Sequence, residues 1–155
     1  MIEQLEHVDQ QLFLFLNSLH CPFLDPIMYA ISGKLIWVPL YVAILTYLAI
    51  REKKKFFLLV LFIILAAVLT DQTTNIIKFA VKRLRPCHEP ALEGMVHVLG
   101  NCGGLYSFVS AHAANSFDVA MLSLLFIRKR WYTFVIVIWA IVIGYSRIYL
   151  GVHYP

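Results

Sequence analysis

Four long stretches of the chain consist mainly of apolar residues, and short polar links separate them. They cover residues 27–50, 56–84, 111–127 and 131–150. A helix that crosses a bilayer needs about 20 mostly apolar residues, so each stretch predicts a membrane-spanning helix. The pair Asp25-Pro26 precedes the first stretch and is typical of a helix start. The second stretch is apolar as far as Leu69 and then becomes polar while it keeps helical spacing.

Residues 7–24 contain a shorter apolar run that polar residues interrupt, which favours a helix lying at the membrane surface. The composition agrees with a lipid environment. Hydrophobic residues make up 61% of the 155 positions and charged residues only 14%, whereas soluble domains carry about 25% charged residues. The pattern therefore predicts an all-α fold, a polytopic transmembrane helix bundle, in a single domain over residues 1–155.

The basic residues of two short links predict the orientation in the membrane. Residues 51–55 and 128–130 carry seven basic residues, and two spans lie between the links, so both are on one side. The positive-inside rule assigns that side to the cytoplasm. The loop 86–109 and the end of the fourth span then face outward. We expect an inner (plasma) membrane protein whose functional residues lie on the periplasmic or extracellular side.

A polar stripe follows the second half of the second span. Its residues recur at spacings of four, three, four and three, and they are Asp71, Asn75, Lys78, Lys82 and Arg85. Such spacings place side chains on one face of a helix, and charges within a span normally face the protein interior. We interpret Lys78 and Arg85 as functional. Lys82 and Arg83 are interpreted as anchors that reach lipid headgroups. Asp71 and Asn75 either orient the cations or form an interhelical hydrogen-bonded pair.

Two further clusters lie at the same predicted side of the membrane. Ser110 is a candidate N-cap for the third span, and the free amides that follow it at Ala111 and His112 suit an anion. Arg147 and His153 mark the end of the fourth span. Fixed cations and N–H groups stabilise a transferring phosphoryl group. One histidine can attack phosphorus while the other protonates the leaving oxygen. No carboxylate set for a metal accompanies them, so neither a metal nor a cofactor is expected.

The cysteine pattern indicates no zinc site, because no CxxC spacing is present. Cys87 and Cys102 fall in the same polar loop, so a disulfide is an option if that loop faces an oxidising compartment. Free thiols are the default expectation.

Three ordered motifs match a known family. The first is Lys78, six residues and then Arg85-Pro86; the second is Val109-Ser110-Ala111-His112; the third is Ser146-Arg147, five residues and then His153. With these motifs the chain resembles the type 2 phosphatidic acid phosphatase (PAP2) superfamily of integral membrane lipid phosphatases, from about residue 7 to the last residue. In the second motif Val replaces the family's Pro and Ala replaces its Gly.

The resemblance implies a role for each motif residue. His153 is similar to the family's nucleophile, which forms a phosphohistidine, and His112 to its general acid. Lys78, Arg85 and Arg147 resemble the phosphate clamp, which Ser110 and the amide of Ala111 would complete. The family needs no metal. Its third motif ends in an Asp that would fall two residues after Pro155, and a further span normally follows. We therefore expect that the chain is truncated and that the 155-residue form is poorly active.

The expected function is a phosphatase acting on a lipid phosphomonoester or diphosphate, with no nucleic-acid partner. Undecaprenyl diphosphate, phosphatidylglycerol phosphate, phosphatidic acid and a lipid A phosphate are the candidate substrates, and the outward site favours the first and last. A lipid phosphotransferase would use the same residues. A non-catalytic lipid-phosphate-binding protein is the alternative from another class, and a transporter is ranked behind it, because the spans lack paired broken helices near the midplane.

Overall fold

Helices account for the whole secondary structure of the computed structural model, which describes residues 2–155, with side chains from residue 4 onward. The described residues contain no strand, and the all-α class is thereby confirmed. The six α-helices are α1 (Ile2–Asn17), α2 (Asp25–Ile31), α3 (Val38–Glu52), α4 (Phe56–Val81), α5 (Ala111–Phe126) and α6 (Arg130–Tyr149). Short 3-10 helices occur at Leu35–Trp37, Lys53–Lys55, Pro86–His88 and Pro90–Leu92.

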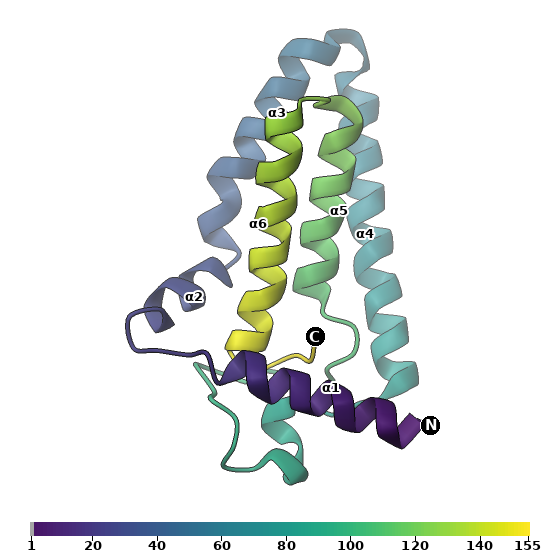
Figure 1. Ribbon diagram of the computed structural model, residues 1–155. Coiled ribbons are helices and arrows are strands. Elements are labelled where there is room, and N and C mark those ends of the chain that lie inside the picture. The colour runs from purple at the N-terminus through teal and green to yellow at the C-terminus, as the bar shows by residue number, and fades with distance from the viewer. Residues whose placement is uncertain (1) are drawn as a thin grey trace.

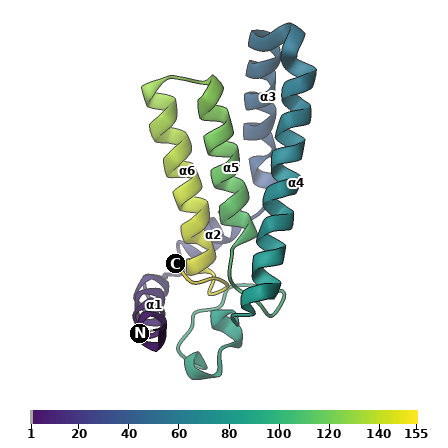
Figure 2. The same cartoon turned by 90° about the vertical axis from the view of Figure 1, so that its right-hand side faces the viewer.

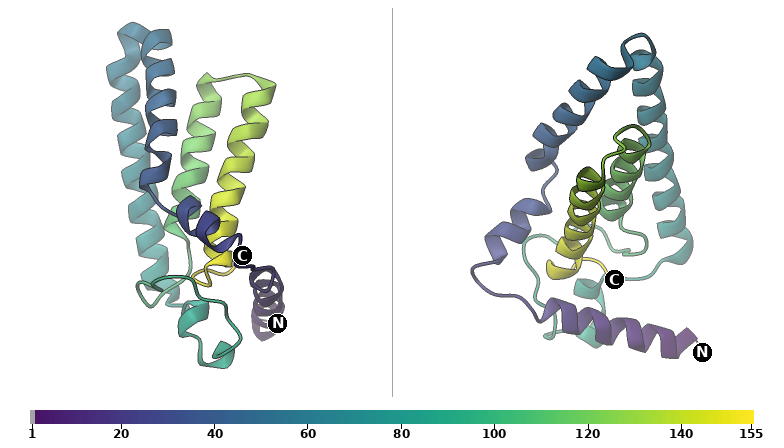
Figure 3. Two further views of the ribbon diagram at one scale, coloured as in Figure 1. Left: turned by 90° about the vertical axis from the view of Figure 1, so that its left-hand side faces the viewer. Right: turned by 45° about the horizontal axis from the view of Figure 1, so that its top comes forward.

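The long helices form two antiparallel hairpins, α3–α4 and α5–α6 (Figure 1). Helix α1 lies across the end of the bundle at a steep angle to α6, beside the loop that joins α4 to α5 (Figures 1 and 2). Helices α3 and α4 meet at Lys53–Lys55 and diverge towards the opposite end (Figure 3, right), and the α5–α6 hairpin lies on one side of this pair (Figure 3, left). The chain end at residue 155 and the start of α5 lie at this open end.

Two helical stretches of the described chain are long and apolar enough to cross a membrane, Leu35–Val81 and Arg130–Tyr149. The first includes both α3 and α4 and reverses its direction at Lys53–Lys55 (Figure 1). Along α4, only Leu59 and Thr74 are buried, while Phe57 is 80% exposed. A large apolar surface of this kind suits contact with lipid. The four spans themselves remain a prediction.

The interior of the bundle is centred on α6. Its residues Ile136, Trp139, Ala140 and Ile143 are buried against side chains of the other three long helices, namely Ile44 and Leu48 of α3, Leu59 of α4 and Ala120 of α5. Burying one large apolar side chain contributes roughly 1.5–3 kcal/mol relative to exposure in water. The cluster therefore fixes α6, and with it the residues that follow α6, relative to the other helices.

Three predicted helices differ from those in the structure. The stretch 27–50 is not one helix, because the chain breaks after Ile31 and resumes as α3 at Val38. The indole nitrogen of Trp37 donates to the carbonyl of Ile31 at 2.8 Å and bridges this break. The stretch 56–84 ends as a helix at Val81, since Lys82 adopts a left-handed conformation (φ 53°) that stops it. The helix predicted over residues 7–24 is shorter at its C-terminal end, since α1 ends at Asn17.

Candidate active site

Arg85 is positioned by a loop and not by α4. After the left-handed turn at Lys82, the backbone forms a bridge between Leu84 and Tyr106. The guanidinium then donates to two loop carbonyls, from Nη1 to Cys102 at 2.7 Å and from Nε to Tyr106 at 3.2 Å. The prediction that Arg85 shares a helix face with Lys78 is therefore wrong. Both residues nevertheless act electrostatically on His153, as described below.

The loop that holds Arg85 is closed by a disulfide between Cys87 and Cys102, whose Cα atoms are 6.4 Å apart. The default expectation of free thiols is therefore wrong for this pair. Cys102 contributes both a sulfur to the disulfide and the carbonyl that accepts from Arg85. The disulfide thus restrains a direct partner of the guanidinium. His88 lies beside the two sulfurs, but these atoms are bonded to each other and not available as a pair of thiolate ligands.

His153 is held in the interior by a sharp turn at the end of α6. Gly151 adopts φ +74°, and a Cβ atom there would approach the carbonyl oxygen of His97 to 2.6 Å, so only glycine fits. After this turn the amides of Val152 and His153 both donate to the carbonyl of Arg147, at 3.1 and 3.2 Å. The His153 side chain is 4% exposed.

The imidazole of His153 lies close to the side chain of Ser107, whose hydroxyl oxygen is 3.4 Å from Nδ1. Ser107 is itself 2% exposed, and its amide donates to the carbonyl of Arg83 at 2.8 Å. No sequence motif pointed to Ser107, because it lies 46 positions before His153 in an irregular loop. The structure therefore adds Ser107 to the candidate site.

The surroundings of His153 favour the neutral imidazole. Its pKa is lowered to about 3, chiefly by burial and also by the positive charges of Arg85, Arg147 and Lys78. A weaker contribution from Ser107 acts in the opposite direction. Burial also lowers the pKa of Arg85. An uncharged imidazole among three cations is equipped to act as a nucleophile on an anionic group.

Arg147 lies in the last turn of α6, where its Nη1 donates to the hydroxyl of Ser32. Ser32 follows α2 directly, so the break between α2 and α3 supplies this partner. The Nε atom of Arg147 is buried and has no hydrogen-bond partner within the described chain. A buried donor of this kind gains from an added acceptor, and a phosphate oxygen is one.

His112 occupies the first turn of α5, which begins at Ala111. The Ser110 hydroxyl accepts from the amide of Ala113 at 3.4 Å, so Ser110 caps the helix. The positive charges of Arg147, Arg85 and Lys78 interact electrostatically with His112 as well as with His153. The charge of Lys34 also interacts with His112. Lys34 is a second residue that the sequence motifs did not indicate.

Arg83 is not free to reach lipid headgroups, and that interpretation is wrong. Its Nη1 forms an ion pair with Asp9 of α1 at 2.6 Å, and its guanidinium carbon lies 3.7 Å from the ring centroid of Tyr154. This contact joins α1 to the segment that carries His153. Lys82 is exposed, in agreement with a surface role.

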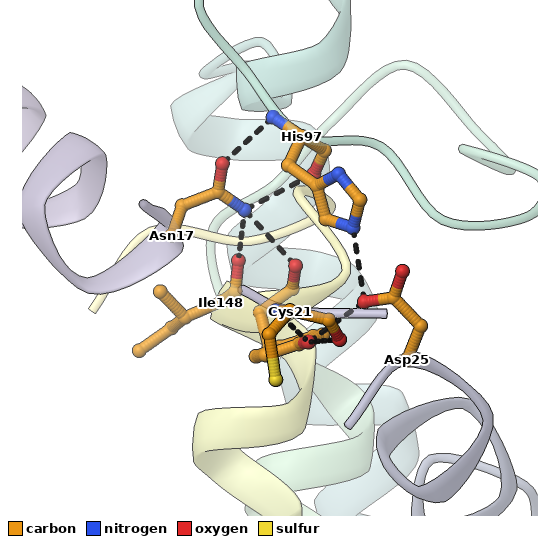
Figure 4. A network of polar contacts seen from close by, with 6 residues as sticks. Asn17, Cys21, Asp25, His97 and Ile148 are labelled. Atoms are coloured by element: carbon orange, nitrogen blue, oxygen red, sulfur yellow. Dashed lines mark hydrogen bonds and ion pairs between the residues drawn. The ribbon is translucent and has the colours of Figure 1, made fainter. Parts of the chain in front are cut away.

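A polar network ties α1 and α2 to the end of α6 (Figure 4). The amide nitrogen of the Asn17 side chain donates to the carbonyls of His97, Ile148 and Tyr149, at 3.0–3.1 Å, and its oxygen accepts from the amide of His97 at 2.8 Å. The Asp25 carboxylate accepts from the Tyr149 hydroxyl at 2.7 Å and lies 3.2 Å from Nε2 of His97. Accepting from Tyr149 lowers the pKa of Asp25. The network fixes the backbone just before Gly151 and His153.

Comparisons with known proteins agree with this architecture. Two lipid A 4'-phosphatases match over nearly the whole chain, one from Bacteroides thetaiotaomicron at 43% identity and one from Porphyromonas gingivalis at 36%. The matches cover 100% and 99% of this chain, and 71% and 66% of the respective relatives.

Two solved structures are also similar. The crystal structure of Aquifex aeolicus LpxE is 29% identical with a TM-score of 0.68, covering 94% of this chain and 82% of that one. A PAP2-type phosphatidylglycerolphosphate phosphatase from Bacillus subtilis, 21% identical with a TM-score of 0.74, covers 97% of this chain and 75% of that one and shares the fold. The sequence profile of the PAP2 superfamily matches residues 55–155, and the chain belongs to that superfamily.

Proposed function

We propose that the protein is a lipid phosphatase that removes the 4'-phosphate from a lipid A-type glycolipid through a phosphohistidine. The observation that carries the proposal is His153, a buried and neutral imidazole that contacts Ser107 and is surrounded by the charges of Arg85, Arg147 and Lys78. The names of the two relatives, lipid A 4'-phosphatases at 43% and 36% identity, favour this substrate among the candidate lipid phosphates.

In the proposed reaction the phosphate binds to Lys78, Arg85 and Arg147 and to the amide of Ala111 after the Ser110 cap. Arginine suits bidentate contact with phosphate oxygens, and the buried Nε of Arg147 is an unused donor within the described chain. Fixed cations stabilise the charge that develops on the phosphoryl group. We therefore propose that the reaction needs no metal ion.

The phosphoryl group is then transferred twice. Nδ1–H of His153 donates to the Ser107 oxygen, which leaves the lone pair on Nε2 to attack phosphorus. The N–P bond forms as the P–O ester bond breaks, and the sugar oxygen takes the electron pair of that bond and a proton from His112. His112 enters this step protonated because the negative charge of the bound phosphate offsets the charges of Arg85, Arg147 and Lys78. Water then attacks phosphorus and gives a proton to His112. The N–P bond breaks with its electrons returning to Nε2, and inorganic phosphate leaves.

The proposed location of this chemistry is the outer face of the inner membrane. The basic links 51–55 and 128–130 lie at the end of the helix hairpins opposite to the C-terminal end of the chain (Figure 1), an arrangement that agrees with the positive-inside rule. A disulfide between Cys87 and Cys102 also suits a loop on the oxidising side of that membrane.

The proposal is tested with the full protein in phospholipid vesicles that contain a glycolipid labelled at its 4'-phosphate. We expect phosphate release in the presence of EDTA and an acid-labile labelled protein after rapid quenching. The variant His153→Asn removes the histidine of the site, and the matched control His7→Asn removes an exposed histidine of α1. Only His153→Asn should abolish both signals. A chelator-sensitive reaction would contradict the metal-free mechanism. Binding without release would indicate a lipid-phosphate binder, and transfer to another lipid a phosphotransferase.

A further inference from the structure

A groove between α3, α4 and α5 leads away from His112. It consists of three adjoining cavities that share lining residues, with volumes of about 250, 500 and 120 Å³. The first cavity touches His112 and shares Lys34, Asp71 and Asn115 with the second. The second shares Asp118 with the third. We call the whole cavity system the α3–α5 groove.

The polarity of this groove changes with distance from the phosphate site. Near His112 the lining combines apolar residues with polar side chains, among them Ser32, Lys34, Asp71 and Asn115. The far cavity is lined mainly by aliphatic side chains, among them Ile44, Leu48, Ile63 and Leu122, with Asp118 and Ser123 as polar members. His112 and Leu122 are ten residues apart on α5, which corresponds to about 15 Å along a helix. A ligand that fills the groove must therefore have a polar part next to the phosphate and an apolar part beyond it.

The polar part of the groove combines aromatic rings with hydrogen-bonding groups. Trp37 and Tyr41 contribute aromatic side chains, and the Trp37 ring is fixed by its indole hydrogen bond to Ile31. Asp71 supplies a carboxylate that accepts hydrogen bonds. The side-chain oxygen of Asn115 is buried and has no hydrogen-bond partner in the part of the chain that the structure describes. A hydroxyl-bearing ligand would supply the missing donor.

These features match a sugar ring, whose hydroxyls donate to carboxylate and amide oxygens and whose C–H faces pack on aromatic rings. We propose that the polar part of the α3–α5 groove binds the sugar of the leaving group, with Asp71 and Asn115 as its hydrogen-bond acceptors. The acyl chains of the same glycolipid then lie along the apolar part. This inference rests on the proposed phosphatase function and names the groups that select a glycosyl headgroup over a glycerol one.

The position of the groove fits the proposed reaction. The first cavity is bounded by His112, the proposed proton donor to the leaving oxygen, and by Ser32, which holds Arg147. A sugar that occupies this cavity presents its phosphorylated oxygen to His112 while the phosphate contacts the cations. Binding energy at the sugar then orients the reacting bond, which raises the rate on glycolipids specifically.

The experiment measures kcat/KM of the full protein on two substrates in vesicles, a 4'-phosphorylated glycolipid and phosphatidic acid with acyl chains of the same length. Asp71→Asn and Asn115→Ala should each lower kcat/KM on the glycolipid by 10- to 100-fold. The same variants should change the value on phosphatidic acid, and the inhibition constant of inorganic phosphate, by less than threefold. The control Thr73→Ala alters an exposed polar residue of α4, the helix that carries Asp71. It should leave both kcat/KM values and the inhibition constant of phosphate unchanged.

The other outcomes would overturn either the sugar site or the proposed function. An equal fall on both substrates, or no fall on either, would overturn the sugar site. A weakened inhibition by phosphate would place Asp71 and Asn115 in the phosphate site and would also overturn the inference. Failure of the wild-type protein to release phosphate from any lipid would instead refute the proposed function, which separates the two results.

Discussion

Nδ1 of His153 lies 3.4 Å from the hydroxyl oxygen of Ser107, and both side chains are almost completely buried. A hydrogen bond at Nδ1 fixes the orientation of an imidazole and determines which nitrogen keeps its lone pair. Because the backbone amide of Ser107 is itself bonded to Arg83, the serine is held in place independently of His153. Ser107 is therefore suited to orient the proposed nucleophile.

Replacing Ser107 with alanine should lower kcat by about tenfold and leave KM nearly unchanged. The variant loses the hydrogen bond that orients the ring, and such a bond contributes about 0.5–1.5 kcal/mol, while tenfold in rate corresponds to about 1.4 kcal/mol. Steady-state kinetics on the labelled glycolipid measure both constants. Ser107→Thr keeps the hydroxyl and should recover most of the lost rate.

Ser123→Ala is the control for that prediction. Ser123 is also buried and lines the apolar end of the α3–α5 groove, but its hydroxyl donates to the carbonyl of Ala120 within α5, far along the helix from His112. This variant should keep the kcat of the wild type. If Ser107→Ala also kept it, Ser107 would have no orienting role.

The sequence was sufficient for the parts of the fold that local signals encode. A serine cap at Ser110 marks the start of α5, and apolar periodicity marks α6. The break after Ile31 was missed because an isolated glycine, Gly33, is tolerated within helices. The real determinants of the break are tertiary, since Trp37 bonds back to Ile31 and Ser32 accepts from Arg147.

The candidate site likewise contains residues that the sequence could predict and residues that it could not. Lys78, Arg85, Arg147 and the two histidines carry side chains of recognisable chemistry at fixed spacings, and sequence reasoning could select them. Ser107 and Ser32 carry common hydroxyls in irregular segments, and they meet their partners across 46 and 115 positions. Contacts between such distant segments follow from packing and leave no periodic signal in the sequence.

Gly151→Ala should destabilise the protein and reduce activity more than tenfold. The new Cβ atom would lie 2.6 Å from the carbonyl oxygen of His97, and φ +74° is unfavourable for any residue with a side chain. The loss in free energy of unfolding should be about 1–3 kcal/mol, and the turn that carries His153 should shift. Thermal unfolding in detergent and glycolipid turnover measure the two effects.

Gly104→Ala is the matched control, because its Cβ atom would meet nothing within 4 Å and its φ is not positive. It should change neither the melting temperature nor the rate noticeably. A Gly151→Ala variant with the same behaviour as Gly104→Ala would show that the turn tolerates a side chain.

The stability of the protein should depend on pH through His153. Its pKa lies at about 3 in the folded chain against an ordinary 6.5, so between these values the unfolded chain binds a proton that the folded chain does not. The free energy of unfolding therefore rises with pH across this window. With about 1.4 kcal/mol per pKa unit, acidification from pH 7 to 3 should cost on the order of 4 kcal/mol at this residue.

Urea unfolding at several pH values tests this dependence. His153→Gln removes the titrating group, so the variant should lose less stability than the wild type between pH 6.5 and 3. His7→Gln replaces an exposed histidine on α1 and should keep the slope of the wild type. Equal slopes for wild type and His153→Gln would mean that the imidazole accepts a proton in the fold without cost.

The disulfide should stabilise both the loop and the phosphate site. The double variant Cys87→Ser, Cys102→Ser releases a loop with a sequence separation of 15, and closing a loop of that length contributes about 3 kcal/mol in the chain-entropy model. The free energy of unfolding should fall by about that amount. Because Cys102 also provides the carbonyl that accepts from Arg85, the guanidinium should become less ordered, and inhibition by inorganic phosphate should weaken severalfold.

Cys21→Ser separates this effect from a general response to thiol chemistry, since Cys21 forms no disulfide in the described chain. Reductant should lower the stability of the wild type and of Cys21→Ser alike, and it should have no effect on the double variant. If reduction lowered stability while inhibition by phosphate stayed constant, the disulfide would hold the loop without positioning Arg85. The carbonyl of Tyr106, which accepts from Nε of Arg85 at 3.2 Å, would then be sufficient to orient the guanidinium.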